Sequence, residues 1–350
     1  MNTFKLCMSN GWILVTELLI VTGNNYFSDF LIVAAKTKIL IIVFKQNLSF
    51  GGTMIISNIW LIIFATISSF SRGIISVIDR YQMGYRKQSS IDVNFLNNIC
   101  SSVLVTFFLI YVLHSFPSPR ITNNYLIKVL LYAFLAQVVA YGYSYVFKKV
   151  SIMQSVLLSK VTDLFIPWAI LLTMGYFSKS SYLVSIISTV IVVIYIVFEQ
   201  RHNNLNLKIL LTTFAVIAPL LIIQAALSPL LTKGLIKPID LVFFTIMTIY
   251  VRCLITLITF IYKNRTLKIS AENLKGKVYL IYGSRAVLTL LAQVTYTLAT
   301  SSPNSSIAWI FLNMTSLYSV IFGDIFLKEK MKFADILVIV AIFILALFSN

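Results

Sequence analysis

Long apolar runs separated by short polar loops dominate this chain after residue 54. A helix needs ~20 mostly apolar residues to cross ~30 Å of membrane hydrocarbon, and these runs are close to that length. The pattern therefore predicts ten membrane-spanning helices. Their expected positions are Ile55–Ile78, Phe95–Leu113, Leu126–Phe147, Ile152–Met174, Tyr182–Phe198, Ile209–Leu231, Ile239–Tyr262, Val278–Thr300, Ile307–Leu327 and Phe333–Phe348.

The pattern also repeats within the chain. The tetrapeptide Leu-Ala-Gln-Val occurs at Leu135–Val138 and again at Leu291–Val294, and the apolar runs that follow each copy keep the same offset. Internal repeats of this kind are typical of transporters. Each copy would hold five helices, an odd number, so the second copy must be inverted relative to the first. The predicted fold is an all-α integral membrane protein of ten transmembrane helices, with inverted five-helix repeats at residues 54–200 and 201–350.

Residues 1–53 form an extension before both repeats. Their two apolar stretches, Trp12–Val21 and Phe30–Phe44, are short, and the second contains Lys36 and Lys38. Neither stretch predicts a membrane span. Two interpretations stay open: a segment that lies in the membrane interface, or an extension that is not authentic because translation begins at Met54. A cleaved signal peptide is not expected, because the first stretch lacks a basic leader and a small-residue cleavage site.

The composition agrees with a membrane protein. Hydrophobic residues make up 59% of the chain and charged residues 11%, and the mean hydropathy is +0.92. That leaves too little polar residue to cover a soluble surface of this size. We therefore expect a multi-pass protein of the cell membrane, plasma or inner, whose surroundings are the lipid bilayer.

Charge and cysteine usage exclude several function classes. The formal net charge of +17 lies mainly in loops, where anionic lipid and the positive-inside rule account for it, so no nucleic-acid partner is expected. Lys and Arg are most numerous after the odd-numbered spans, which favours external chain ends. The three cysteines, Cys7, Cys100 and Cys253, are scattered. We therefore expect no disulfide framework, metal site or cofactor.

The last two predicted spans contain a recognisable stretch, which runs from Ser302 through Trp309–Tyr318 to Phe322–Lys330. It resembles the closing signature of the drug/metabolite transporter superfamily, specifically its EamA-like members. In these proteins a proline or serine turn precedes a span that ends in a Gly-x-x-x-Leu-Gly-Glu-like pattern. Lys328 stands where the family often has glycine, and Ser316 where it often has proline.

The first predicted span also fits this family, because Ile78–Tyr81 resembles the Asp-Lys or Asp-Arg ending found in many members. The resemblance covers roughly Met54–Phe348. It implies a ten-helix inverted repeat, transport of amino acids or their analogues with efflux as the expected direction, and cytoplasmic termini. The last expectation is opposite to the one from the charge count, and both remain open.

Ionisable residues at membrane depth are functional candidates, because an unpaired charge there costs several kcal/mol. Lys160 and Asp163 are three residues apart and are equally well explained as a mutual ion pair or as a substrate or proton site. Arg252 lies in the middle of its span, and Arg285 lies about a third of the way along another. For Arg72 and Asp324, near span ends, snorkelling to the interface is favoured.

Polar residues within the spans complete the candidate site. Gln137 and Gln293 occupy equivalent positions in the two repeats, so an inverted repeat would bring them close together at the midplane. Interhelical hydrogen bonding is the alternative role. The remaining candidates are tyrosines that could line a cavity or form an interfacial belt, and a polar strip on the ninth span. They are Tyr141, Tyr282, Asn313 and Ser316.

The leading hypothesis is a secondary transporter that moves a small polar metabolite by alternating access. The interior is positively charged, which would favour an anionic substrate, and protonation of Asp163 could couple release to protons. Exchange of phosphorylated or nucleotide-linked sugars is the alternative. An integral-membrane transferase fits less well, because His114 and His202 have no acidic residue at close spacing. A channel or assembly subunit is a third class, and both monomer and homodimer stay open.

Overall fold

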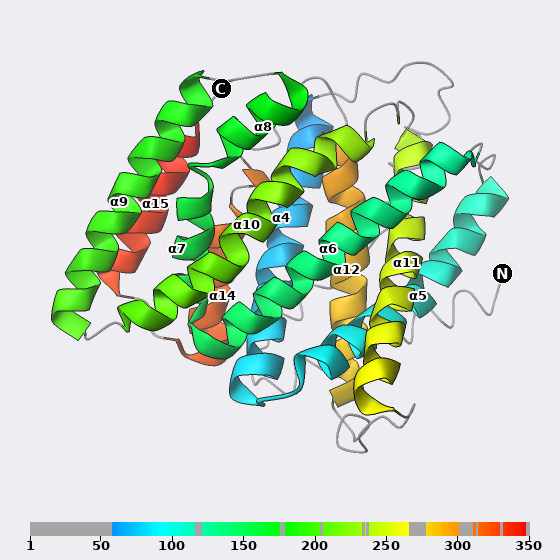
Figure 1. The fold of residues 1–350 in the computed structure, drawn as a ribbon, viewed down its shortest axis with the longest axis horizontal. Helices are drawn as coiled ribbons and strands as arrows, with labels where there is room; N and C mark the ends of the chain where they lie inside the picture. Colours follow the sequence, from blue (N-terminus) through cyan, green and yellow to red (C-terminus); the bar gives the residue numbers. More distant parts are fainter. Residues whose placement is uncertain are drawn as a thin grey trace.

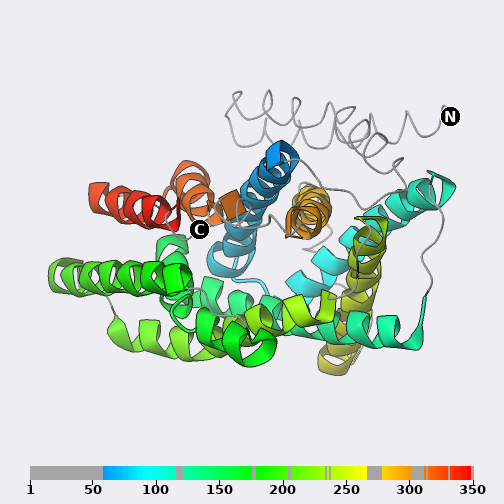
Figure 2. The ribbon, with the colours of Figure 1, turned by 90° about the horizontal axis from the view of Figure 1, so that it is seen from above.

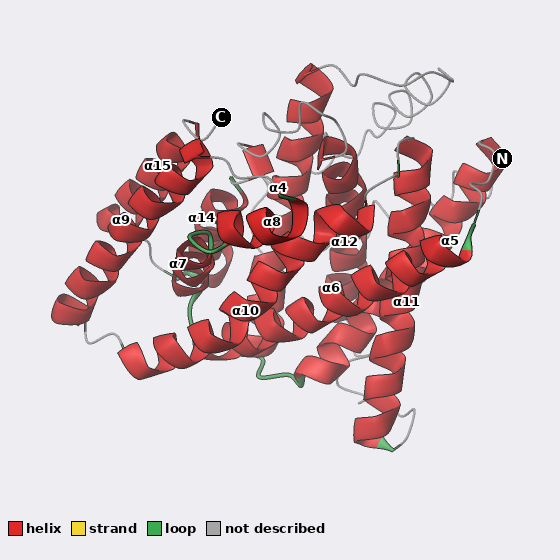
Figure 3. Cartoon of the chain, turned by 45° about the horizontal axis from the view of Figure 1, so that its top comes forward, coloured by secondary structure: helices red, strands yellow, loops and turns green. Residues whose placement is uncertain are grey.

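The computed structural model describes residues 58–115, 121–175, 179–203, 206–232, 235, 238–265, 278–300, 311–312, 314–329 and 332–347. The predictions for residues 1–53 lie outside this part of the chain. Within it, all regular structure is helical and no strand occurs (Figure 3). The elements are α4 (Asn58–Arg80), η1 (Tyr81–Tyr85), α5 (Ser90–Ser115), α6 (Asn123–Lys149), α7 (Ile152–Thr162), α8 (Ile166–Met174), α9 (Lys179–Asn203), α10 (Leu207–Thr232), α11 (Pro238–Asn264), α12 (Val278–Thr300), α14 (Thr315–Leu327) and α15 (Phe333–Leu347).

Nine of the ten predicted apolar runs coincide with a helix or a pair of helices, with ends that differ by up to five residues. For the predicted run Ile307–Leu327, the described helix α14 covers Thr315–Leu327, and residues 307–310 and 313 lie outside the described part of the chain. One prediction is wrong: Ile152–Met174 is not a continuous helix but breaks between α7 and α8, with a bend of 44°. Pro167 lies in the first turn of α8, where the missing N–H of proline is tolerated. In the middle of a continuous helix the same residue would remove a backbone hydrogen bond and break or kink the helix.

Membrane-spanning length and hydropathy are met by five of the described helices, or by six if α7 and α8 together form one broken span. These five helices are α4 together with η1, α5, α6, α10 and α11. Large apolar side chains such as Leu130 and Phe134 on α6 and Ile194 on α9 are exposed. Acyl chains would cover such surfaces in a bilayer, which fits a multi-pass membrane protein.

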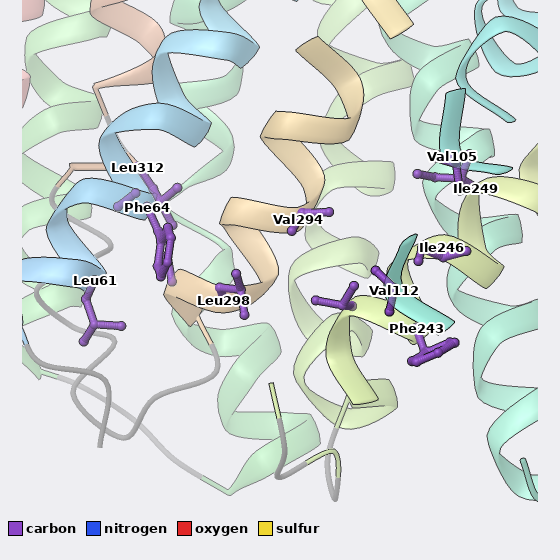
Figure 4. Close-up of a cluster of buried hydrophobic side chains, with 13 residues drawn as sticks. Leu61, Phe64, Val105, Val112, Phe243, Ile246, Ile249, Val294, Leu298 and Leu312 are labelled. Atoms are coloured by element: carbon purple, nitrogen blue, oxygen red, sulfur yellow. The ribbon is translucent and has the colours of Figure 1, made fainter. Parts of the chain in front are cut away.

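The helices pack in a pattern that mixes early and late parts of the chain. α4 packs mainly against α12 and α14, while α10 packs against α6, α7 and α8. α5 contacts α11 and α12, and α9 pairs with α15 at one edge of the molecule (Figures 1 and 2). A cluster of 13 buried apolar residues joins α4, α5, α11 and α12 (Figure 4). The two parts of the chain therefore share a core.

Small residues let these helices approach closely, as is usual in membranes. The hydroxyl of Ser68 on α4 donates a 2.9 Å hydrogen bond to the backbone carbonyl of Ala292 on α12. A Cβ added at Gly73 would lie 2.6 Å from Cβ of Tyr318 on α14. α4 is thus held tightly between α12 and α14.

Lys328 ends α14 in the left-handed conformation, with φ 55° and ψ 30°. Its N–H bonds to the carbonyl of Asp324 at 3.1 Å, and the N–H of Glu329 to that of Gly323 at 3.4 Å. This is the capping geometry in which glycine is preferred, because a Cβ is strained there. The geometry gives a physical reason for glycine at this position in EamA-like sequences.

Replacing Lys328 by Gly should therefore stabilise the protein by about 1 kcal/mol, because it removes the strain of a left-handed side chain. Thermal unfolding in detergent measures the change. Lys328→Val is the matched control and should lower the unfolding temperature, since a β-branched residue fits this conformation worst. A loss of stability in the glycine variant would contradict the assigned cap.

Candidate functional site

α5 carries a polar face inside the molecule that hydropathy alone does not reveal. The face consists of Asn94, Asn97, Asn98, Ser101 and Ser102, all of them buried. Their spacing of i, i+3, i+4, i+7 and i+8 places them on one side of a helix. This periodicity is visible in the sequence and is the signal that could have identified them, although the predicted span started only at Phe95.

Gln137 on α6 is completely buried and connects this face to α11. Its side-chain oxygen accepts hydrogen bonds from the amide of Asn98 at 2.9 Å and from Nε of Arg252 at 3.2 Å. Its own amide donates to Asn94 at 3.3 Å, and Asn94 in turn donates to Ser144 at 2.7 Å. The predicted residues Gln137 and Arg252 are thus brought together.

Tyr141, one turn after Gln137, joins the same network. Its hydroxyl lies 2.7 Å from the hydroxyl of Thr259 on α11 and also interacts with the Gln137 side chain. The guanidinium of Arg252 has no carboxylate partner among the described residues, and only its Nε makes a hydrogen bond there. Within the described residues, the one side-chain hydrogen bond of the Arg252 guanidinium is therefore the one to the amide oxygen of Gln137.

Arg285 on α12 is neutralised by a residue that was not predicted. Its Nε and Nη2 donate to the two carboxylate oxygens of Asp79 on α4 at 2.8 and 2.9 Å, and Nη1 donates to Thr289 at 3.0 Å. Two parallel bonds of this kind are the strongest arrangement for a guanidinium and a carboxylate. The pair joins α4 to α12 near one end of α4.

Arg72 on α4 does not extend toward the nearby end of its helix, so the snorkelling prediction for it is wrong. Its guanidinium stacks on the ring of Tyr296 on α12, 4.1 Å from the ring centroid. Helical side chains lean toward the N terminus of their helix, which directs Arg72 away from the near end at Arg80 and toward mid-helix. Sequence spacing could not reveal Tyr296 as its partner.

Lys160 and Asp163 form the ion pair considered from their spacing, with Nζ and Oδ2 3.1 Å apart. The Lys160 side chain is 9% exposed and the Asp163 side chain 36%. Asp163 lies at the C-terminal cap of α7, at the start of the break before α8. The pair is therefore placed at a bend between two short helices, not on a continuous helical face.

A third ion pair lies at the C-terminal end of α4. Nε of Arg80 lies 2.9 Å from Oε1 of Glu329, and Nη1 of Arg80 donates to the backbone carbonyl of Phe147. Oε2 of Glu329 accepts from the N–H of Ile152 at 2.9 Å, which caps the start of α7. The hydroxyl of Tyr85 donates to Oε1 of Glu329 at 3.1 Å. This end cluster links α4, η1, α6, α7 and the end of α14.

The remaining predicted residues have no described contact with the buried network around Gln137 and Arg252. Tyr282 is buried, and its hydroxyl bonds to Gln88 at 3.4 Å, near the start of α12. On α12, Tyr282 lies 14 residues before Tyr296, the ring partner of Arg72, which corresponds to ~21 Å along the helix. Gln293 and Ser316 are half-buried, and the expected approach of Gln293 to Gln137 stays a prediction. Asn313 lies outside the described residues.

A comparison with protein-family models gives a match over part of the chain. The family model described as the EamA-like transporter family matches residues 212–350. The resemblance found in the closing signature is confirmed for this part of the chain, which includes Arg252 and Arg285. A search of curated proteins finds no match.

Proposed function

We propose, from the EamA-like match over residues 212–350, that this chain is a secondary active transporter that moves a small polar metabolite across the membrane by alternating access. The observation that carries the proposal is the buried network in which Gln137 accepts hydrogen bonds from Asn98 and Arg252. Polar and charged groups at membrane depth are costly, so a network of this extent is explained best by a polar cargo. An amino acid or related compound, moved outward, is the leading candidate.

The packing of the helices supports the inverted repeat that this mechanism requires. α4 would be the first helix of one repeat and α10 the first of the other. Each packs against the third and fourth helices of the opposite repeat: α4 against α12 and α14, and α10 against α6 and the α7–α8 pair. A pseudo-two-fold axis that relates the two repeats would produce this reciprocal packing. The proposed repeats, 54–200 and 201–350, would then rock about the polar network.

The end cluster supports a gate for the same mechanism. Arg80 and Glu329 belong to different proposed repeats, and Glu329 also caps α7. Rocking of one repeat against the other would separate these groups and open that end of the protein. The ion pair is only partly exposed, with side chains 16% and 14% accessible, so its loss in the open state would have to be offset by new contacts elsewhere.

Uptake into proteoliposomes tests the proposal. Vesicles that contain the full-length protein are incubated with a pool of metabolites, and the contents are identified by mass spectrometry. We expect accumulation of amino acids or related compounds, with saturable concentration dependence. Accumulation of sugar phosphates would favour the alternative exchanger, and chemical conversion of a pool component would favour a transferase. Vesicles that take up no metabolite would contradict the transporter.

Proton coupling would be carried by Asp163, because its carboxylate is the more exposed member of the pair with Lys160 and lies at the α7–α8 break. Asp163→Asn should abolish the response of uptake to a pH gradient while leaving exchange of substrate intact. Asp92→Asn, at the start of α5, is a matched control and should keep the response. A pH response that survives in Asp163→Asn would remove the proton role.

A further inference from the structure

Arg252 lies near the middle of α11 and forms no ion pair within the described part of the chain. The ion pairs found there are Arg80–Glu329, Lys160–Asp163 and Arg285–Asp79. Arg285 and Asp79 act electrostatically on Arg252, but they neutralise each other through two short bonds. An arginine at membrane depth is costly unless it is paired or faces water. The described structure therefore leaves the positive charge of Arg252 without a counter-charge.

The Arg252 guanidinium keeps its two terminal nitrogens available. Its Nε donates to the side-chain oxygen of Gln137 on α6 at 3.2 Å, and Nη1 and Nη2 make no hydrogen bond with a described residue. Gln137 also accepts from Asn98 on α5 at 2.9 Å, so the acceptor that orients the guanidinium is itself held by a second helix. Two adjacent nitrogens of a planar guanidinium match the two oxygens of a carboxylate. Arg252 therefore presents an oriented fork of donors.

Contacts between α5 and α11 place Ser102 at the level of this arginine. Asn98, Ser102 and Thr106 follow one another at intervals of four residues and therefore lie in one row along α5. The amide nitrogen of Asn98 lies 3.5 Å from the hydroxyl of Thr256 on α11. The hydroxyl of Thr106 lies 2.8 Å from that of Tyr250, also on α11. Both neighbours of Ser102 in the row thus face α11, and the stretch of α11 between their two partners contains the arginine.

The Ser102 hydroxyl is buried and has no hydrogen-bond partner. Ser102 is 8% exposed, and Asn97 on the same polar face, whose side-chain amide also lacks a partner, is 2% exposed. Buried polar groups without partners are rare in folded proteins, so each one needs an explanation. A hydroxyl and a guanidinium fork can both donate hydrogen bonds. A group that satisfies Ser102 and Arg252 together must therefore offer acceptor oxygens.

We propose that Arg252 and Ser102 bind a carboxylate group of the transported molecule. Nη1 and Nη2 of Arg252 would each donate to one carboxylate oxygen, and the Ser102 hydroxyl would donate to one of the same two oxygens. The inference rests on the transporter proposal and assigns the chemical group by which the cargo is held.

The charge of the site favours a carboxylate over a phosphate monoester. A carboxylate carries one negative charge, which the single positive charge of Arg252 balances. A phosphate monoester carries about 1.5–2 negative charges at pH 7, and the excess would be buried without a partner, which is costly. The site should therefore select carboxylate compounds such as amino acids over sugar phosphates.

Thermal unfolding of the full-length protein in nanodiscs of zwitterionic lipid tests the site. The probes are sodium propionate, propionamide and sodium phosphate, with sodium chloride at equal ionic strength as the reference. Propionate should raise the unfolding temperature saturably, because it binds the folded protein. Propionamide has nearly the same shape without the charge and should give no shift. Phosphate should bind more weakly than propionate.

Two substitutions assign the effect to the proposed residues. Arg252→Gln should weaken the apparent affinity for propionate about tenfold or more, since it removes the charged fork. Ser102→Ala should weaken it about tenfold through the loss of a hydrogen bond to a charged group, without lowering the stability of the ligand-free protein, in which that hydroxyl has no partner. Ser69→Ala is the matched control: its hydroxyl is buried but already bonds to the carbonyl of Thr66 at 3.0 Å, so the affinity should be unchanged.

Three results would overturn the site: no propionate shift beyond the chloride reference, an equal or larger shift with propionamide or phosphate, or an affinity that survives either substitution. If Arg252→Gln does not fold, Arg252→Lys replaces it, because it keeps the charge but loses the planar fork and should still weaken binding. Metabolite uptake measured separately distinguishes the two proposals. Carboxylate binding without any uptake would contradict the transporter but not the site, and uptake without carboxylate binding would contradict the site alone.

Discussion

Arg285→Gln is expected to destabilise the protein by about 3–5 kcal/mol, because it leaves the buried Asp79 carboxylate without its counter-charge. Both members of the pair are 8% exposed, and Asp79 receives both of its short charged bonds from Arg285. Since the pair joins α4 to α12, metabolite uptake should fall together with stability. Unfolding by denaturing detergent, followed by circular dichroism, measures the free energy.

The reciprocal and double variants show whether charge balance is the cause. Asp79→Asn should cost a similar amount, because it leaves Arg285 buried and unpaired. The double variant Asp79→Asn/Arg285→Gln should be more stable than either single variant, since two amides can bond to each other and no buried charge is left. Strictly additive losses in the double variant would mean that the two side chains do not act as a pair.

Gly73→Ala is expected to destabilise the protein by about 3 kcal/mol, an effect as large as that of many core deletions. The added Cβ would lie 2.6 Å from Cβ of Tyr318 and 3.1 Å from the backbone nitrogen of Ser319. Neither atom belongs to a flexible side-chain end, so α14 would have to move away from α4. Because Glu329 follows directly after the Lys328 cap of α14, the displacement should loosen the end cluster and reduce uptake.

The same substitution at Gly283 is the matched control. An added Cβ there would meet no heavy atom within 4 Å, so Gly283→Ala should be neutral or stabilising by up to about 1 kcal/mol through helix propensity. Thermal unfolding of the two alanine variants under identical conditions compares them. Equal effects at the two positions would contradict the close packing of α4 against α14.

The helix positions could be predicted from the sequence because a membrane helix is determined mainly by a long apolar run. The break between α7 and α8 is not evident from hydropathy, because the run from Ile152 to Met174 has the length of a single span. Its signs in the sequence are the polar residues around Asp163 and the proline at position 167. Such a proline does not by itself distinguish a kink from the start of a new helix.

The candidate site could be predicted only in part. Arg252, Arg285, Lys160 and Asp163 could be selected as candidates because a charged residue inside a long apolar run is visible in the sequence. Their partners depend on which helices pack together, so Asp79 was not recognised as the counter-ion of Arg285. For the same reason the sequence favours an interfacial position for Arg72, whose ring partner Tyr296 lies on a helix far away in the chain.

Exchange kinetics in proteoliposomes test the central claim of alternating access most directly. Once a metabolite has been found by uptake, its labelled form is added outside vesicles that are empty or loaded with the unlabelled compound. A carrier with one central site predicts saturable entry that is faster into loaded vesicles, because the loaded site returns more readily than the empty one. Entry that rises linearly with concentration and is indifferent to the internal compound would contradict alternating access.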